Sequence, residues 1–342
     1  MIIPKQYLIG LLNVLSETSS QLKVDYPPLG HLLDIRIGEK CEITAISREY
    51  FRTSRSNALR LYRNDNFLSR EIPDHDDFKI CMYASSLLNS ENESVLEHEL
   101  QDEGKRNLLK GDKPLFIGYD TNSLRHRSNL LIQNTLSKLS LADSPNIGFC
   151  LSEVAKRELR NQWENKHKKS DIDKLCALHP QATRFLNQHP KTARMARLGA
   201  VEYKHLMAQL NCEEINGKGL GDNNIIQSYE FFRDKRNVDL LLISGDNDFT
   251  AMAHEEKIRS VYMKQPSNYD TNFECQWEEL VELLYCMAII FGHIRLEHID
   301  IYGIWTGKNE DDWDDYRISV ETGDPSIFKD LIILEQSYKL PI

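Results

Sequence analysis

Two aspartates stand directly after short apolar runs of the kind that form buried strands. Asp120 follows the run 115–119, and Asp246 follows the run 240–245. In an open parallel sheet, ligands bind beyond the carboxyl ends of the strands. Each aspartate is also followed by polar residues suited to begin a helix. We therefore expect both carboxylates at the same edge of a sheet.

Carboxylates gathered at one point suit the hydrolysis of a phosphodiester bond. The reaction develops negative charge on the phosphate oxygens, and divalent cations neutralise that charge, activate water and align the phosphate. Mg²⁺ and Mn²⁺ prefer carboxylate and water oxygens as ligands. Three or four converging carboxylates repel one another when no cation is bound. Such a site is therefore expected to depend on Mg²⁺ or Mn²⁺.

The elements around these aspartates alternate between short apolar runs and helical stretches. This alternation predicts β-α-β units and an α/β fold with a central parallel sheet. A helix is predicted over 123–139 and another from Ser152. Strands are predicted over 114–119, 146–151, 238–244 and 260–263.

The two ends of the chain differ from this middle part in their pattern of apolar and polar residues. The pattern predicts an α+β accessory domain over 1–110. Within it we expect helices at 3–15 and 48–63 and a hairpin formed by 31–37 and 41–46. A polar linker is predicted at 89–113. A nuclease-like domain is expected over 111–265, with extra helices around 161–209. The extension 266–342 is expected to hold a buried helix at 277–291, strand character at 294–305 and a solvated acidic loop at 309–315, and to pack on the N-terminal region.

Bulk composition narrows the functional class. The chain has 342 residues, 41% hydrophobic and 27% charged, with a net charge of −10. This charge argues against a protein that coats nucleic acid, although a local basic patch could still grip a substrate. The seven cysteines include no C-x-x-C pair, and no apolar run is long enough to span a bilayer. We expect free thiols, no membrane partner and a cytoplasmic location.

Four stretches, taken in order, resemble the motifs of PIN-domain nucleases. They are Tyr-Asp-Thr-Asn-Ser-Leu (119–124), Leu-Ser-Glu-Val-Ala-Lys-Arg-Glu-Leu (151–159), Gly-Asp-Asn-Asn-Ile-Ile (221–226) and Ile-Ser-Gly-Asp-Asn-Asp-Phe (243–249). The last stretch also resembles the NYN branch of that superfamily. The resemblance covers about 150 residues. It implies a PIN-like three-layer fold, a Mg²⁺ or Mn²⁺ cofactor and endonucleolytic cleavage of RNA.

The resemblance also implies roles for individual residues. The four acids map to Asp120, Glu158, Asp222 and Asp246, the first-motif asparagine maps to Asn122, and Ser244 falls where the family often has Thr or Ser. Asp120, Asp222 and Asp246 would hold the metal. Glu158 would be a further ligand or would orient the attacking water.

Several assignments have a structural alternative. Glu153 and Glu158 lie about 140° apart on a helix, so only one of them faces the site easily. Asp248 is either a further metal ligand or an acid favoured by the start of a helix. Asp120 and Asp222 could be helix caps, a role that does not exclude a functional one.

Basic residues offer contacts for the phosphate groups of a substrate. The segment 153–204 carries twelve Lys or Arg against six Asp or Glu, the reverse of the whole chain. Solvated helix faces are the structural alternative for all of these residues. The candidates are Arg125 and Arg127 beside His126, then Lys166, Lys168, Lys169, Lys191, Arg194 and Arg197, with Trp163 or Phe185 as stacking partners.

The sequence thus predicts a metal-dependent endoribonuclease, with RNA as substrate and a protein partner contacting residues 1–110. An inactive PIN-like scaffold for RNA or protein and a structure-specific DNA nuclease are the alternatives. A haloacid-dehalogenase-like phosphatase is disfavoured because Asn122 stands where that family has its second aspartate. A role as a toxin stays open.

Overall fold

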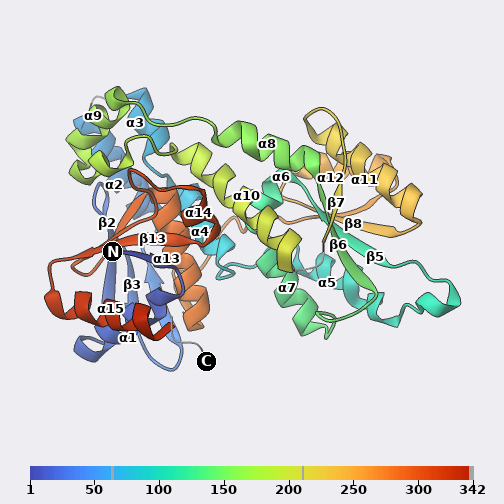
Figure 1. The fold of residues 1–342 in the computed structure, drawn as a ribbon, viewed down its shortest axis with the longest axis horizontal. Helices are drawn as coiled ribbons and strands as arrows, with labels where there is room; N and C mark the ends of the chain where they lie inside the picture. Colours follow the sequence, from blue (N-terminus) through green and yellow to red (C-terminus); the bar gives the residue numbers. More distant parts are fainter. Residues whose placement is uncertain (63–64, 210–211, 339–342) are drawn as a thin grey trace. The chain divides into compact units, whose positions relative to one another are not determined.

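The computed structural model of the protein describes residues 1–62, 65–209 and 212–338. The chain forms two compact units (Figure 1), each assembled from separate stretches of sequence. The parallel unit comprises Leu88–Glu164 and Met195–Asn268. The antiparallel unit comprises Met1–Leu87, Asn165–Arg194 and Tyr269–Ile342. Residues 266–342 therefore share a unit mainly with the N-terminal stretch, and 165–194 belong to it as well.

The parallel unit is built on a five-stranded sheet, which confirms the α/β class and the predicted parallel sheet. Its strands run in the order β7-β6-β5-β8-β9, and every neighbouring pair is parallel. The strands are β5 (Leu115–Tyr119), β6 (Ile147–Ser152), β7 (Cys212–Ile215), β8 (Asp239–Ser244) and β9 (Arg259–Tyr262).

The strand order reverses direction between β5 and β8. From β5 the chain proceeds outward through β6 to β7, then returns to the other side of β5 for β8 and continues to β9. Helices that start from two such neighbouring strands diverge onto opposite faces, which leaves a crevice beyond the carboxyl ends of the two strands. Asp120 and Asp246 lie at those two carboxyl ends.

Helices cover the parallel sheet on both faces (Figure 1). Tight turns separate them: Arg127 has φ +52°, which splits the helix predicted over 123–139 into two. The helices of this unit are α5 (Glu93–Gln101), α6 (Thr121–Arg125), α7 (Asn129–Lys138), α8 (Glu153–Trp163), most of α10 (Lys191–Gln209), α11 (Asp222–Arg236) and α12 (Asn247–Glu255), with short 3-10 turns η1 (Glu103–Lys105) and η2 (Leu108–Lys110).

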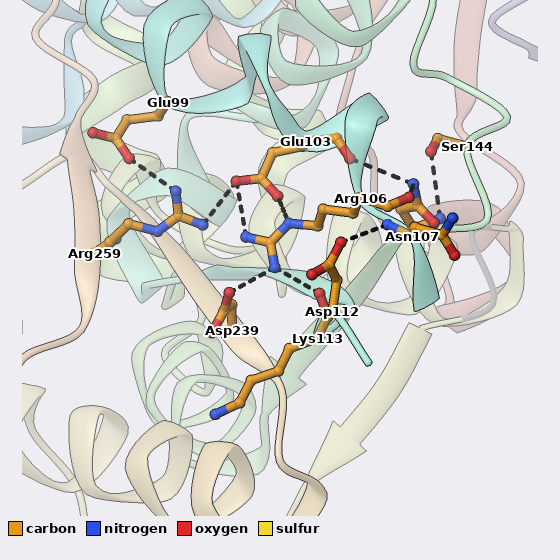
Figure 2. Close-up of polar contacts among 10 residues, drawn as sticks. Glu99, Glu103, Arg106, Asn107, Asp112, Lys113, Ser144, Asp239 and Arg259 are labelled. Atoms are coloured by element: carbon orange, nitrogen blue, oxygen red, sulfur yellow. Dashed lines mark hydrogen bonds and ion pairs between the residues drawn. The ribbon is translucent and has the colours of Figure 1, made fainter. Parts of the chain in front are cut away.

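The stretch 89–113 is folded, so the prediction of a linker there is wrong. Leu96 and Leu100, one helical turn apart on α5, are both fully buried. Beyond α5, Glu103 accepts hydrogen bonds from two arginines, Arg106 and, at 3.0 Å, Arg259 (Figure 2). Arg106 also reaches Asp239 at the start of β8, at 2.6 Å. These ion pairs fasten the polar stretch to the amino end of the sheet, opposite Asp120.

The antiparallel unit contains an eight-stranded sheet in the order β1-β13-β12-β11-β2-β3-β4-β10. Strands from the end of the chain pair with strands from its beginning, as β13 does with β1 and β11 with β2. The strands are β1 (Ile2–Pro4), β2 (Gln21–Tyr26), β3 (Gly30–Arg36), β4 (Cys41–Ala45), β10 (Asn272–Cys275), β11 (His293–Leu296), β12 (Ile299–Tyr302) and β13 (Arg317–Thr322).

The core of the antiparallel unit is formed around one apolar helix. In α13 (Trp277–Phe291) every residue from Leu283 to Phe291 is buried, as the sequence predicted. The other helices are α1 (Tyr7–Thr18), α2 (Arg48–Leu61), α3 (Asn66–Glu71), α4 (His75–Ala84), α9 (Lys169–Leu178), the 3-10 turn η3 (Pro180–Phe185), α14 (Glu310–Asp314) and α15 (Pro325–Tyr338), and α10 begins here.

Two further sequence predictions concern this unit. The hairpin of 31–37 and 41–46 is confirmed by the antiparallel pairing of β3 with β4. The acidic stretch 309–315 contains the short helix α14, capped by Asn309, where a loop was predicted. Its residues 309–311 and 315 are exposed as expected, whereas Trp313 is buried. None of the helices in the described ranges is both long and apolar enough to cross a membrane.

Candidate functional site

Asp120 ends β5 and caps the helix that follows it. Its Oδ1 accepts the backbone N–H of Ser123 at 2.6 Å, and its Oδ2 accepts the hydroxyl of Ser244 at 2.5 Å. The residue is only 2% exposed. Burial raises the pKa of Asp120 to about 6, although these hydrogen bonds act in the opposite direction. The ionised carboxylate is thus incompletely stabilised by the protein.

Ser244 connects Asp120 to the second strand-terminal acid. Besides donating to Asp120, its Oγ accepts the backbone N–H of Asp246 at 2.9 Å. Asp246 in turn caps α12, because its Oδ1 accepts the N–H of Asp248 at 2.8 Å. The chain makes a close approach here, since a Cβ added at Gly245 would lie 3.2 Å from Nδ1 of His126. The two loops that follow β5 and β8 therefore lie against each other.

Glu158 links two further loops at this edge. Its Oε2 accepts the hydroxyl of Thr121 at 2.5 Å, directly after Asp120. Its Oε1 accepts the backbone N–H of Gly221, directly before Asp222. Glu153 instead pairs with Arg157 at 3.8 Å. Of the two glutamates that the sequence left open, Glu158 is the one that contacts the loops carrying Asp120 and Asp222.

Asp222 is the first residue of α11 and its side chain is exposed. Its pKa is raised by partial loss of solvent and then by the negative charges of Glu158 and Asp246. The charges of Glu158 and Asp246 therefore both act on Asp222. Asp120 shares Ser244 with the backbone of Asp246, and we call the residues Asp120, Glu158, Asp222 and Asp246 the acidic site.

A tyrosine on α11 helps to position the acidic site. The hydroxyl of Tyr229 accepts the backbone N–H of Tyr119 at 3.0 Å and donates to its carbonyl oxygen at 2.8 Å. Tyr119 directly precedes Asp120. Gly118 leaves room for the ring, because a Cβ there would lie 2.6 Å from Cε1 of Tyr229. The helix that begins at Asp222 is thereby tied to the strand that ends at Asp120.

The donor chemistry of the acidic site suits Mg²⁺ or Mn²⁺. Across residues 1–62, 65–209 and 212–338, however, no group of three or more His, Cys, Asp or Glu side chains is gathered tightly enough to hold a metal ion. Mg²⁺ is commonly held by one or two carboxylates and completed by water and substrate phosphate oxygens. The carboxylates of the acidic site supply oxygen donors for such open binding, and positive charge beside Asp120 would stabilise its buried ionised form.

Arg125 and Asn122 lie on α6, next to Asp120. The Nη1 of Arg125 is 3.5 Å from Oδ1 of Asn122, and its Nε has no hydrogen-bond partner among the described residues. Burial lowers the pKa of Arg125, and Asp120 opposes that effect. His126 is neutral, because burial and then Arg125 lower its pKa to about 4. Arg125 is thus a half-buried cation beside the acidic site.

Two other predicted phosphate contacts are buried inside the parallel unit. Arg127 is 3% exposed and pairs with Glu202 at 3.2 Å. Arg197 is also 3% exposed, and its guanidinium lies over the ring of Trp163, 4.5 Å from the centroid. Both side chains hold α10 in place. The structure gives them a role in packing and does not present them to solvent.

The remaining basic candidates lie in the antiparallel unit. Lys166, Lys168 and Lys169 are exposed. Arg194 is fully buried and donates to Glu71 at 2.6 Å, while Lys191 is buried against Asp77. Phe185, a predicted stacking partner, is buried as well. Half of the six residues predicted to form a basic track are therefore structural, and the track is not a continuous surface.

Sequence reasoning missed three groups that shape the acidic site. Thr121, the backbone N–H of Gly221 and Tyr229 all bond to residues at or beside the four acids. A signal for Gly221 was present in the glycine-containing stretch 217–221, and this residue adopts φ +94°. Tyr229 had no such signal, because its partner lies 110 residues earlier.

No protein-family model matches this chain, and no curated protein sequence matches it. The roles of the residues in the acidic site are therefore inferred from this chain alone.

Proposed function

We propose that this protein is a Mg²⁺- or Mn²⁺-dependent endoribonuclease that hydrolyses RNA at the acidic site. The observation that carries the proposal is the meeting of Asp120 and Asp246 at the reversal point of a parallel sheet, joined through Ser244. Ligands bind at this position in open α/β sheets. Asp222 adds a carboxylate whose pKa is raised in part by Glu158 and Asp246.

Each residue of the acidic site has a proposed task. Asp120, Asp222 and Asp246 would hold the cation, which when bound neutralises phosphate charge and activates water. Glu158, fixed by Thr121 and Gly221, would be a further ligand or would orient the attacking water.

The residues beside the acidic site have subsidiary tasks. Asp248 is exposed in the first turn of α12 and is proposed as an additional ligand. Arg125 would grip a phosphate oxygen, since guanidinium groups match phosphate geometry.

RNA is the proposed substrate because the four motifs resemble those of nucleases that usually cleave RNA. Labelled single-stranded RNA, structured RNA and matched DNA are incubated with the protein and Mn²⁺. We expect RNA cleavage that stops in excess chelator. Asp120→Asn and Asp246→Asn should each lose at least about 100-fold in rate, the scale on which single electrostatic groups act in catalysis. Asparagine caps helices as well as aspartate does, so both variants should fold.

The matched control is Asp143→Asn, an exposed residue in the turn before β6, at the amino edge of the sheet. It removes the same charge and should cleave at the wild-type rate. Equal activity of Asp120→Asn and wild type would refute the assignment of the acidic site. Cleavage of DNA alone would favour the DNA nuclease alternative, and no cleavage of any substrate would favour a scaffold.

A further inference from the structure

A polar pocket lies in the antiparallel unit, between α2 and the start of α4. We call it the arginine pocket, and its volume is about 300 Å³. This is at the lower end of the range of pockets that bind small ligands, about 300–1,000 Å³. Its lining consists of Arg52, Arg55, Ser56, Leu59, Asp74, His75 and Asp76.

Arg55 is held in place before any ligand binds. Its Nε donates to the carbonyl of Pro73 at 3.1 Å, and its Nη2 donates to the carbonyl of Ser69 at 2.5 Å. In the part of the chain that the structure describes, its Nη1 has no partner. These bonds fix the plane of the guanidinium, so little conformational entropy remains to be lost when an anion binds. The guanidinium of Arg55 is therefore already positioned, and its Nη1 can donate a hydrogen bond to a bound anion.

Two more arginines share that face of α2. Arg48, Arg52 and Arg55 are spaced four and three residues apart, so they lie along one side of the helix. Arg48 and Arg52 are exposed, and neither has an ion pair or hydrogen bond within the described ranges. Of these three arginines, Arg52 and Arg55 line the pocket. Their mutual repulsion would be relieved by a bound anion.

The acids of the arginine pocket already have partners. Asp74 caps α4, and its Oδ1 accepts the N–H groups of Asp76 and Asp77. The carboxylate of Asp76 lies 3.6 Å from Nζ of Lys79. His75 is stacked on Tyr269 with ring centroids 5.7 Å apart, and it donates or accepts a hydrogen bond with the Tyr269 hydroxyl at 2.8 Å. Arg52 has no ion pair within the described ranges and Arg55 keeps one N–H group without a partner there, so these two side chains are the donors that could receive an anion.

We propose that the arginine pocket binds the phosphate group of a nucleotide, either free or within a single-stranded polynucleotide. Arg52 and Arg55 supply planar donors that match phosphate oxygens, and Ser56 supplies a hydroxyl. His75, held against Tyr269, adds an aromatic residue to the lining beside the arginines. This binding does not depend on the acidic site, because every residue involved lies in the antiparallel unit.

The test measures binding by the full-length protein in buffer that contains EDTA, so that cleavage cannot interfere. One arm follows ADP binding by calorimetry, and the other follows the fluorescence anisotropy of a short labelled single-stranded RNA. We expect Arg52→Ala to weaken binding about tenfold or more in at least one arm, the effect of one charge-assisted hydrogen bond. Arg52 is exposed, so the variant should keep its fold, which thermal unfolding checks.

The matched control is Arg36→Ala, which removes the same charge from an exposed site on β3 where Arg36 pairs with Glu42. A loss in the ADP arm alone identifies a free nucleotide as the source of the phosphate. A loss in the RNA arm identifies a polynucleotide strand, and a loss in both supports a site open to either. The proposal is overturned if the wild-type protein binds neither probe, or if Arg36→Ala weakens binding as much as Arg52→Ala.

Discussion

The side chain of Asp120 is both a helix cap and the most deeply buried carboxylate of the acidic site. As a cap it needs only its bond to Ser123, which a helix start of this kind ordinarily provides. Its burial goes beyond that need and raises its pKa to about 6. Burial that is unfavourable to an isolated carboxylate is expected where a cation or a proton is to be bound. The residue thus carries a structural role and the proposed functional role at once.

This raised pKa predicts how the stability of the metal-free protein depends on pH. Because the folded pKa is about 6 and the ordinary value is 3.8, the folded state binds more protons than the unfolded state between these values. The contribution of Asp120 to stability is therefore present at low pH and is lost as pH rises through about 6. Its loss should amount to roughly 2–3 kcal/mol.

The measurement is urea unfolding in EDTA at pH 4, 5, 6 and 7, for wild type and Asp120→Asn. The variant lacks the titrating group, so its stability relative to wild type should improve from pH 4 to pH 6 and level off towards pH 7. A constant difference between the two proteins would show that the Asp120 carboxyl is not perturbed.

At the residue scale, the sequence predicted that Asp120 and Asp246 follow neighbouring strands, as the structure shows, but it did not predict what surrounds them. Asp120 and Asp246 could be found because each follows a continuous apolar strand. Arg127 and Arg194 were taken for phosphate contacts, yet both are buried against glutamates 75 and 123 residues away in the chain. Nothing local distinguishes a solvated arginine from one that is paired across such a separation.

At the element scale, Tyr229 joins α11 to β5. The hydroxyl satisfies the buried N–H and carbonyl of Tyr119, and no other side chain bonds to that N–H in the described part of the molecule. Tyr229→Phe removes this side-chain partner from the N–H and the carbonyl of Tyr119. We expect a loss of about 1–3 kcal/mol in the free energy of unfolding, measured by urea titration.

The control for this prediction is Tyr262→Phe on β9, since the Tyr262 hydroxyl makes no hydrogen bond to any described residue. This control should stay within about 0.5 kcal/mol of wild type, as is usual away from special features. If Tyr229→Phe is as stable as Tyr262→Phe, the hydroxyl does not fasten the helix to the strand.

The strands and helices that sequence predicted best are those with strong local patterns. β5 and β8 are nearly continuous apolar runs, and α13 is apolar over most of its length, so all three were found. β7 is a short edge strand, Cys-Glu-Glu-Ile. It was not predicted because its two central residues are glutamates, so it does not form an apolar run. The helix break at Arg127 depends on a left-handed backbone conformation. Arginine rarely adopts this conformation, so nothing in the sequence indicated a break there.

At the scale of the whole molecule, the chain leaves the antiparallel unit and returns to it twice. Its sheet joins β1 to β13, whose partner residues Ile2 and Ser319 lie at nearly opposite ends of the chain. Pairings of this kind are set by tertiary packing, so the local pattern of the sequence predicted neither β1 nor β13, and it did not predict where the units divide. The parallel sheet could be foreseen because its β-α-β units are contiguous in sequence around β5, β6, β8 and β9.

The central claim is that the acidic site holds a divalent cation, and a calorimetric titration of the full-length protein with Mn²⁺ tests it most directly. Wild type and Asp143→Asn should show the same saturable binding. Asp120→Asn and Asp246→Asn should each bind at least about tenfold more weakly, because each loses one anionic ligand. Absence of saturable binding in wild type, or unchanged affinity in both site variants, would contradict the claim.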